Sequence, residues 1–494
     1  MHGGAVNRST PVFAIFALSI FPMLAWGDTL SLPEFQAKMQ AQMARLSSKN
    51  TVSIDVQVLG RNQILFAANE NKQLNTASSM KLLTTQAAFA KMGEQFSFAT
   101  NVYVDGVIKG DTLQGNLVLQ GNGDPFLVSE RIWLLAKDVA RFGIKHITGG
   151  IKVNNSAFSE DYRGLLEWED TTQPFAAVVS ATSLNFNSVE VHVTPAKTGA
   201  KPNVEVGPTN NAYIVLVNKL RSVSGGRNSI SIRSIGHTAT QETFELEGSV
   251  GRDAVPSVVY ATVTNPAPYV ADVFAALLRA NGMQIAKDFV GVSFKPEDIP
   301  NTLLVSQQSL SLLELARLYN SFSNNFMAEE IYHGLGAAVN GAPAAISKSR
   351  QTILDYVKQT DSCRNASFDN GSGLTENNGV SSKCFVDNLQ NAYRDFPAFA
   401  DLVSTLPIGG KTGTLKNRFK NHDADFVPEN VRAKSGTLWA KRAVTALVGV
   451  TTTAGGETLV FSVLQNDERG NGSLLAGMRE WEDKCVELMQ RLKL

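Results

Sequence analysis

The order of helical and β-rich segments along the chain is the feature that most constrains its fold. Near the start, alternating apolar residues predict strands over residues 51–59 and 64–68, which lead straight into a helix at about residue 78. At the end, two strongly apolar strands over residues 443–451 and 458–464 are joined by a glycine turn and followed by an amphipathic helix. The middle of the chain is rich in strands. This order implies one core domain that is split in the sequence, with the β-rich middle as an insertion.

The insertion itself changes character along its length. Between residues 192 and 255, threonine and serine alternate with apolar residues, and glycine turns separate the segments, which indicates a small separate β module. The predicted division is a leader at 1–27, the core domain at 28–95 and 298–494, the insertion domain at 96–191 and 256–297, and the β module at 192–255.

The first residues have the pattern of a secretory signal peptide. His2 and Arg8 precede an apolar run over residues 12–24, and Ala25 and Gly27 are small residues that suit cleavage. The alternative is an uncleaved membrane anchor, but the run is short for a span and Pro22 interrupts it. No later run approaches the length of a transmembrane helix, so we expect an exported mature protein without a membrane span.

Composition excludes several classes of function. The chain has 494 residues, of which 43% are hydrophobic and 18% charged, and its formal net charge is zero, as in an ordinary globular protein with a large core. The absence of a basic patch argues against a nucleic-acid partner. The six histidines are scattered, with no pair at metal-binding spacing, which argues against a zinc hydrolase. We therefore expect no metal and no cofactor.

Three cysteines suit an exported protein better than a metal site. Cys363 and Cys384 are close enough in sequence to close a modest loop, and we expect a disulfide between them. Cys485 lies in the C-terminal amphipathic helix, where we expect a buried free thiol.

The segment Ser78-Ser79-Met80-Lys81 is the first candidate for chemistry. A serine three residues before a lysine on a helix places hydroxyl and amine on one face, which suits a serine nucleophile whose base is not histidine. The serine would stand in the first turn, where backbone N–H groups favour a developing negative charge. Alone, a Ser-x-x-Lys motif more often marks a surface helix than a catalytic site, so its meaning depends on partners elsewhere in the chain.

Two further segments could supply those partners. Ser323-x-Asn325 lies between two helical segments, so its hydroxyl and amide point the same way. A Lys-Thr/Ser-Gly triplet occurs three times, at Lys197, Lys411 and Lys434. Only Lys434-Ser435-Gly436 directly precedes the apolar hairpin strands, where a glycine leaves room for a substrate beside the strand. We therefore choose Lys434, and interpret the other two triplets as structural turns.

Ser-x-x-Lys, Ser-x-Asn and Lys-Thr/Ser-Gly in this order resemble the signatures of penicillin-binding proteins and serine β-lactamases. The large insertion narrows the resemblance to the D-alanyl-D-alanine carboxypeptidase/endopeptidase family, the class C low-molecular-mass penicillin-binding proteins (peptidase family S13). It covers essentially the whole mature chain. Asn370 stands where the family usually has Asp, and Ser435 where Thr is commonest, but both keep their hydrogen-bonding capacity. The supporting segments are 121–125, 168–170, 370–374, 406–410 and 413–418.

The resemblance implies an α+β fold, namely a split penicillin-binding/serine β-lactamase-like transpeptidase domain with an antiparallel sheet flanked by helices. The β-rich insertion would form one or two extra domains. The implied function is that of a serine-type D-Ala-D-Ala carboxypeptidase and/or DD-endopeptidase that acts on peptidoglycan stem peptides and cross-links. Such a protein would be acylated by β-lactam antibiotics and would work in the periplasm or in association with the cell wall.

Chemistry and resemblance together imply the catalytic roles. Ser78 would attack the carbonyl carbon of the penultimate D-alanine, and Lys81 would take its proton. Lys81 needs a lowered pKa for this role, which burial and the nearby Lys434 would supply. Ser323 would relay the proton to the leaving amine.

The same reasoning implies the substrate-binding residues. Asn325 would bind a substrate amide, and Lys434 with Ser435 the terminal carboxylate, on a strand kept accessible by Gly436. The backbone N–H groups of Ser78 and Thr437 would form the oxyanion hole. For the diamino acid of a cross-link, Asp170 is the candidate partner of the side chain and Arg418 that of a carboxylate.

Two other functions compete with this interpretation. A β-lactamase or esterase of the same fold would share the three motifs, but the large insertion argues against it. A non-catalytic peptidoglycan-binding protein would be expected to lack Ser78, Lys81 or Lys434, and all three are present.

Overall fold

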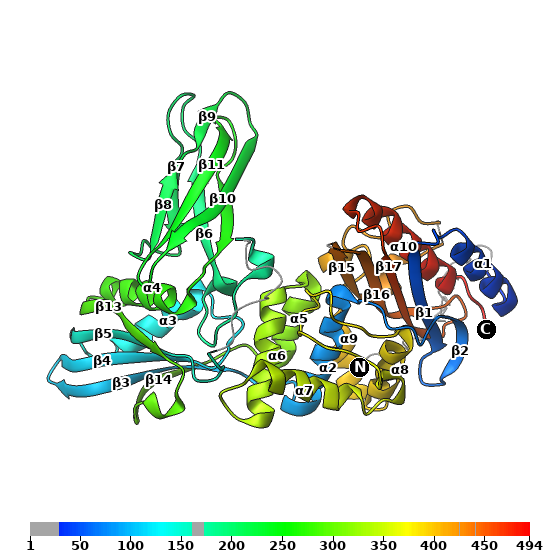
Figure 1. Cartoon of the computed structure of the whole chain (residues 1–494), viewed down its shortest axis with the longest axis horizontal. Helices are drawn as coiled ribbons and strands as arrows, with labels where there is room; N and C mark the ends of the chain where they lie inside the picture. The colour runs from blue at the N-terminus through cyan, green and yellow to red at the C-terminus, as the bar shows by residue number, and fades with distance from the viewer. Residues whose placement is uncertain (1–28, 161–171, 424, 440) are drawn as a thin grey trace, which may run out of the picture.

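The computed structural model describes residues 29–160, 172–423, 425–439 and 441–494. The predicted leader at 1–27 lies outside the described residues. The expected α+β fold is confirmed, because two mixed bodies of helices and strands lie side by side and a narrow β module rises from one of them (Figure 1).

The predicted split of the core domain is also confirmed. Its five-stranded sheet has the order β15-β16-β17-β1-β2, and every neighbouring pair is antiparallel. The two ends of the chain meet where β1 pairs with β17, with Ile54 opposite Val463. The strands are β1 (Asn50–Val58), β2 (Gln63–Ala68), β15 (Arg432–Trp439), β16 (Ala443–Thr452) and β17 (Thr458–Asp467).

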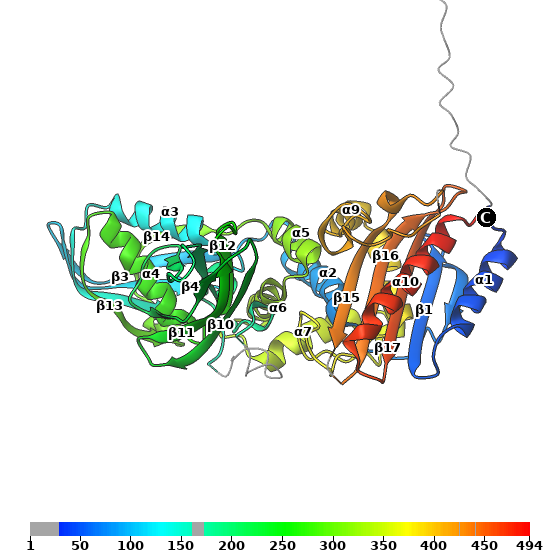
Figure 2. The ribbon, with the colours of Figure 1, turned by 90° about the horizontal axis from the view of Figure 1, so that it is seen from above.

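Helices cover both faces of this sheet, which explains why β16 and β17 are apolar throughout rather than alternating. Figure 2 shows α1 (Leu32–Ala44) and α10 (Leu475–Gln490) on one face, where Leu447 and Phe461 pack against them. Ala446 and Val448 point to the opposite face, which holds α2 (Met80–Met92) and α8 (Ser382–Tyr393). The other core helices are α5 (Leu312–Phe322), α6 (Asn325–Asn340), α7 (Ile346–Val357) and α9 (Phe396–Ser404).

The insertion carries its own mixed sheet, of order β13-β5-β4-β3-β14, with two helices packed against it. Its last strand pairs with β3 although it begins at residue 302, so the insertion sheet extends past the boundary at 298 that the sequence suggests. The elements are β3 (Ala99–Lys109), β4 (Thr112–Gly121), α3 (Ser129–Ala140), β5 (His146–Asn154), α4 (Pro266–Ala280), β13 (Gln284–Ser293) and β14 (Thr302–Gln308).

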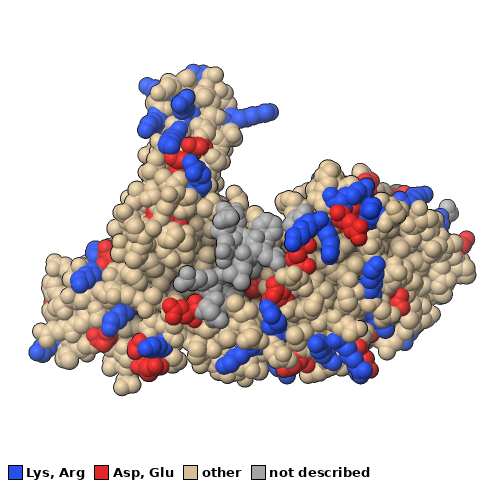
Figure 3. Space-filling view, viewed as in Figure 1, with Lys and Arg blue, Asp and Glu red and all other residues tan. Residues whose placement is uncertain are grey.

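The β module consists of two small sheets, β12-β6-β7 and β10-β11-β8, and β9 also pairs with β11. In the space-filling view the β module projects from the insertion, and a hollow separates it from the core domain on this face (Figure 3). Its strands are β6 (Ser188–Thr194), β7 (Asn203–Gly207), β8 (Ile214–Asn218), β9 (Arg221–Val223), β10 (Asn228–His237), β11 (Glu242–Gly251) and β12 (Ser257–Thr262).

The cysteine predictions are confirmed. Cys363 and Cys384 form a disulfide with Cα atoms 4.8 Å apart, and Cys485 is a buried free thiol on α10. Among the described helices, none is long and apolar enough to cross a membrane. In the same part of the chain, no cluster of three or more potential metal ligands occurs.

Candidate active site

A short, tightly held turn presents Ser78. The 3₁₀ turn Ala77–Ser79 runs directly into α2, and Ala77 has a positive φ of 42°, a conformation that non-glycine residues adopt at a cost. Asn75 fixes this turn, since its Oδ1 accepts the Ala77 backbone N–H at 2.8 Å and its Nδ2 donates to Thr375 O at 2.7 Å. Asn466 of β17 bonds both backbone groups of Asn75, so the turn is attached to the central sheet.

Lys81 lies one turn later and is fully buried. Its Nζ is 2.9 Å from Ser78 Oγ, 2.7 Å from Asn325 Oδ1 and 2.7 Å from Ser372 O. Burial, and then the positive charge of Lys434, lower the pKa of Lys81 well below its usual range, while Glu329 opposes the shift. More of this amine is therefore unprotonated near neutral pH than in an exposed lysine, as a base for Ser78 requires.

Ser323 and Lys434 form a second hydroxyl–amine pair. Ser323 ends α5 in the left-handed conformation, with a φ of 56°, which turns its side chain away from the helix axis. Lys434 Nζ donates to Ser323 Oγ at 2.9 Å and to Ser435 O at 2.8 Å. Lys434 is fully buried, and burial lowers its pKa to about 7.

Asn325 links the core domain to the insertion. It begins α6, while its neighbour Asn324 caps that helix by accepting the Met327 backbone N–H. The Oδ1 of Asn325 accepts from Lys81, and its Nδ2 donates to Phe175 O of the insertion at 2.9 Å. A segment of the insertion therefore lies directly against the candidate site.

Strand β15 forms the opposite edge of the site. Gly436 lies so close to the Ser78 turn that a Cβ there would be 2.4 Å from Thr76 O, and this explains the glycine. On either side of it, Ser435 Oγ donates to Thr414 Oγ1 at 2.7 Å, and Thr437 Oγ1 accepts from Arg479 Nη2 at 3.0 Å.

The structure adds a loop that the motifs did not identify as part of the site. Ser372 O accepts from Lys81, and the buried Glu329 carboxylate accepts the backbone N–H of Ser372 at 2.7 Å and of Gly371 at 3.3 Å. Asn370 Oδ1 accepts the Gly373 N–H at 3.0 Å, so the asparagine does keep the hydrogen-bonding capacity expected of it. The glycine-rich segment was visible in the sequence, whereas nothing there marked Glu329.

The other two Lys-Thr-Gly triplets lie elsewhere. Lys411 is exposed and pairs with Glu429, with 3.2 Å between Nζ and Oε1. Lys197 is in an exposed turn after β6 in the β module. Lys434 is thus the one of the three that contacts Ser323.

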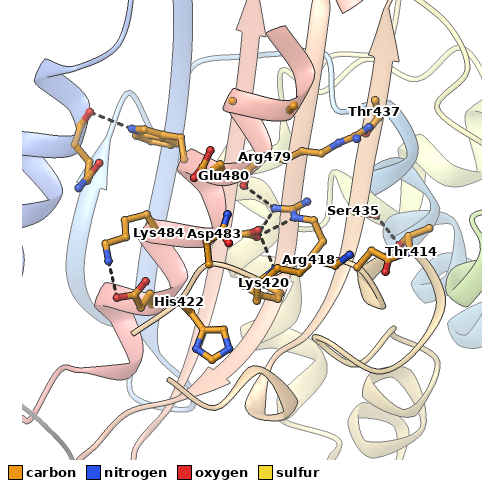
Figure 4. Close-up of a pocket in the computed structure, with 18 of the residues that line it drawn as sticks. Thr414, Arg418, Lys420, His422, Ser435, Thr437, Arg479, Glu480, Asp483 and Lys484 are labelled. Carbon is orange, nitrogen blue, oxygen red and sulfur yellow. Dashed lines mark hydrogen bonds and ion pairs between the residues drawn. The ribbon is translucent and has the colours of Figure 1, made fainter. Parts of the chain in front are cut away.

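The structure tests the position of only one of the two residues expected to bind the diamino acid. Asp170 lies outside the described residues. Arg418 is largely buried and pairs with Asp483 at 2.6 Å and with Glu482 at 3.1 Å, both on α10. These carboxylates raise its pKa although burial alone would lower it. Figure 4 shows Arg418 paired with Asp483, in the lining of a pocket that Ser435 and Thr437 also line.

Comparisons with known proteins match most of the chain. A model of the D-Ala-D-Ala carboxypeptidase 3 (S13) family matches residues 35–485. The chain is 29% identical to a D-alanyl-D-alanine carboxypeptidase of Actinomadura sp. (strain R39), with 96% of this chain and 89% of that protein covered. It is 26% identical to D-alanyl-D-alanine carboxypeptidase DacB of Haemophilus influenzae, with coverages of 88% and 89%.

The fold has a solved counterpart. The crystal structure of penicillin binding protein 4 (dacB) from Haemophilus influenzae superimposes with a TM-score of 0.76 at 23% identity, covering 90% of this chain and 98% of that chain. A likeness that covers nearly all of both chains includes the insertion as well as the core domain.

Proposed function

The chain belongs to the D-Ala-D-Ala carboxypeptidase 3 (S13) family and is a serine-type D-Ala-D-Ala carboxypeptidase and/or endopeptidase, and we propose that it works through an acyl-enzyme on Ser78. The observation that carries this proposal is the position of Lys81 Nζ, which is 2.9 Å from Ser78 Oγ and 2.7 Å from Asn325 Oδ1. A buried amine of lowered pKa in contact with a serine hydroxyl is the arrangement that activates such a nucleophile.

The first step is acylation. Ser78 Oγ attacks the carbonyl carbon of the penultimate D-alanine as its proton passes to Lys81. The carbonyl oxygen becomes negative and accepts hydrogen bonds from the backbone N–H groups of Ser78 and Thr437. Gly436 allows this edge of β15 to approach the Ser78 turn closely enough for both donors to converge.

The leaving amine needs a proton. Ser323 can relay to it the proton that Lys81 took from Ser78, which leaves Lys81 neutral again, because the Ser323 hydroxyl is 2.9 Å from Lys434 Nζ and lies two residues before Asn325, which contacts Lys81. The C–N bond then breaks, and the leaving group is either D-alanine or the neighbouring stem, whose diamino acid regains its free amino group. Water, activated again by Lys81, hydrolyses the ester on Ser78 and restores the enzyme.

Substrate binding uses the two edges of the site. Asn325 binds a backbone amide of the peptide, and the strand edge at Lys434, Ser435 and Gly436 binds the terminal carboxylate. Asp170 stays our candidate partner for the amino group of a diamino acid. For Arg418, the two carboxylates of α10 already occupy its guanidinium, and we assign it instead to holding the loop that carries Thr414.

A cell-wall location would follow from the substrate class that we propose. We propose peptidoglycan stem peptides and cross-links as substrates, and β-lactams as inhibitors that acylate Ser78. A solved structure of the Haemophilus influenzae protein is described as complexed with a novel beta-lactam, which supports this expectation. Because its substrate lies outside the cytoplasm, we propose export to the periplasm, in keeping with the leader expected at 1–27.

The domain boundaries near residues 96, 192 and 256 also remain proposals. We now propose that the second part of the core domain begins after β14, because β14 belongs to the sheet of the insertion.

Muropeptide digestion tests this function. Purified protein is incubated with a monomeric pentapeptide muropeptide and with a cross-linked dimer, and the products are analysed by mass spectrometry. Loss of one D-alanine marks carboxypeptidase activity, and conversion of dimer to monomers marks endopeptidase activity.

Two variants make this test specific. Ser78→Ala removes the nucleophile and should abolish both reactions, whereas Ser48→Ala changes an exposed serine and should leave them unchanged. Cleavage by the Ser78 variant at the wild-type rate would contradict the proposed nucleophile.

A further inference from the structure

A cavity of about 780 Å³ lies between β15 and α10, beside the strand that we propose binds the substrate carboxylate. Figure 4 shows side chains from three segments pointing into it, namely Thr414 from a loop, Ser435 and Thr437 from β15, and Arg479 from α10. We call this the β15–α10 pocket. Lys and Arg side chains gather on this part of the core domain (Figure 3).

Two of the cations that line the pocket are already neutralised. Arg418 pairs with Glu482 and Asp483, and Lys484 pairs with Glu487 at 2.6 Å. Arg479, in contrast, makes no ion pair with any residue in the part of the chain that the structure describes. Its guanidinium is partly buried and leaves the acidic face of α10 to donate to Thr437 Oγ1 at 3.0 Å.

The hydrogen bond to Thr437 holds the Arg479 guanidinium near Ser435 on strand β15. Side chains two residues apart on a strand point to the same side and are about 7 Å apart along it. Ser435 and Thr437 therefore face the β15–α10 pocket together, and both of them line it. An anion bound at the Ser435 hydroxyl would have the Arg479 guanidinium as its neighbour along the same edge.

The other cation of this edge is poorly suited to bind an anion alone. Lys434 is fully buried, and its amine already donates to Ser323 Oγ and Ser435 O. With a pKa lowered to about 7, it carries its charge only part of the time at neutral pH. A guanidinium remains charged throughout this range and can offer two parallel donors to a carboxylate.

We propose that Arg479 binds the carboxylate of the residue that leaves, and that it makes the enzyme selective for substrates in which this carboxylate is free. This inference rests on the proposed function and adds to it the group that the β15–α10 pocket recognises. The terminal D-alanine of a stem peptide carries such a carboxylate.

Two peptides test the inference. One ends in D-Ala-D-Ala with a free carboxylate, and the other is the same peptide with a C-terminal carboxamide. The variants are Arg479→Gln, which removes the charge, Arg479→Lys, which keeps it, and Arg45→Gln, which removes a cation from another wall of the same pocket. For each enzyme, kcat and KM are measured on both peptides.

We expect Arg479→Gln to lower kcat/KM for the carboxylate peptide about tenfold or more, mainly through KM, and to change the carboxamide peptide less than about twofold. Arg479→Lys should recover part of the loss, and Arg45→Gln should behave as wild type. A structural role for Arg479 would reduce the cleavage of both peptides equally, and this result would overturn the inference while leaving the proposed function intact. A wild-type enzyme that cleaves neither peptide would overturn the proposed function and the inference with it.

Discussion

The two active-site lysines are both fully buried, yet their electrostatic surroundings differ. Burial lowers the pKa of both lysines, and at Lys81 the charge of Lys434 adds to this shift while Glu329 opposes it. Two neighbouring amines resist being charged together, so a proton held by Lys434 favours a neutral Lys81. Lys434 can therefore supply the positive charge while Lys81 supplies the unprotonated base.

This division predicts a pH profile. The neutral form of Lys81 grows as pH rises, so acylation should speed up on the acidic side and then level off. The charged form of Lys434 is lost as pH rises through about 7, so KM for a carboxylate substrate should increase above that pH. Steady-state kinetics between pH 5 and about 9 would check this, with the carboxamide peptide as the control whose KM stays flat. A KM for the carboxylate peptide that is constant across this range would contradict the assigned role of Lys434.

Gly436 gives a test of close packing at a single residue. In Gly436→Ala the new Cβ would be 2.4 Å from Thr76 O, a backbone atom, so β15 or the Ser78 turn must shift. We expect penicillin acylation to slow by at least about 100-fold, because small displacements of catalytic groups are costly. The matched control is Gly477→Ala on α10, where a Cβ meets nothing within 4 Å, and which should acylate normally. Normal acylation by the Gly436 variant would show that the close approach is not needed.

At this scale, the sequence predicts residues that lie in short motifs and misses those that act across the fold. Ser78 and Lys81 share one helix turn, so their spacing alone predicts contact. Glu329 reaches the site only because α6 packs beside the loop at Ser372, and Arg479 only because α10 packs on the sheet within reach of Thr437. Each of these residues comes from a segment with no recognisable motif, so tertiary packing is the only indication of its role.

Among the elements, the loop over residues 413–418 and α10 depend on each other. Arg418 joins them through Glu482, which is fully buried, and through Asp483, whose carboxylate also accepts the Phe419 backbone N–H. The same loop positions Thr414 against Ser435 of β15. An ion pair in the interior therefore supports the strand edge that we propose binds substrate.

Removing Arg418 should be costly. Arg418→Ala would leave the Glu482 carboxylate buried without its partner, a change that typically costs about 3–5 kcal/mol of folding free energy. Urea unfolding would measure the loss, and the control Arg364→Ala breaks a solvent-exposed pair with Asp361 and should change stability little. Full stability of Arg418→Ala with weakened substrate binding would favour the alternative role as a substrate ligand.

The strands of the core sheet were easier to predict than the helices that pack on them. The apolar runs of β16 and β17 and the glycine turn between them correctly indicated a hairpin. Those runs are continuous because helices cover both faces, and the sequence did not identify α1 and α10 as the cover of one of them. The limits of the insertion could not be read either, since β14 joins its sheet only through long-range pairing with β3.

For the molecule as a whole, the insertion is part of the active-site structure. Phe175 O accepts from Asn325, and Glu330 of α6 accepts the Ser180 backbone N–H at 3.2 Å. Apolar residues of the insertion, among them Phe158 and Val179, share a core cluster with α5 and α6. The helices that carry Ser323 and Asn325 therefore pack against both bodies, and we propose that the insertion influences which peptides reach Ser78.

The central claim is that Ser78 becomes acylated, and mass spectrometry of the intact protein after incubation with benzylpenicillin tests it most directly. The wild-type protein and the Ser48→Ala control should each gain the mass of one penicillin, on the peptide that contains Ser78, and Ser78→Ala should gain none. An adduct that survives in Ser78→Ala, or that maps to another residue, would contradict the account.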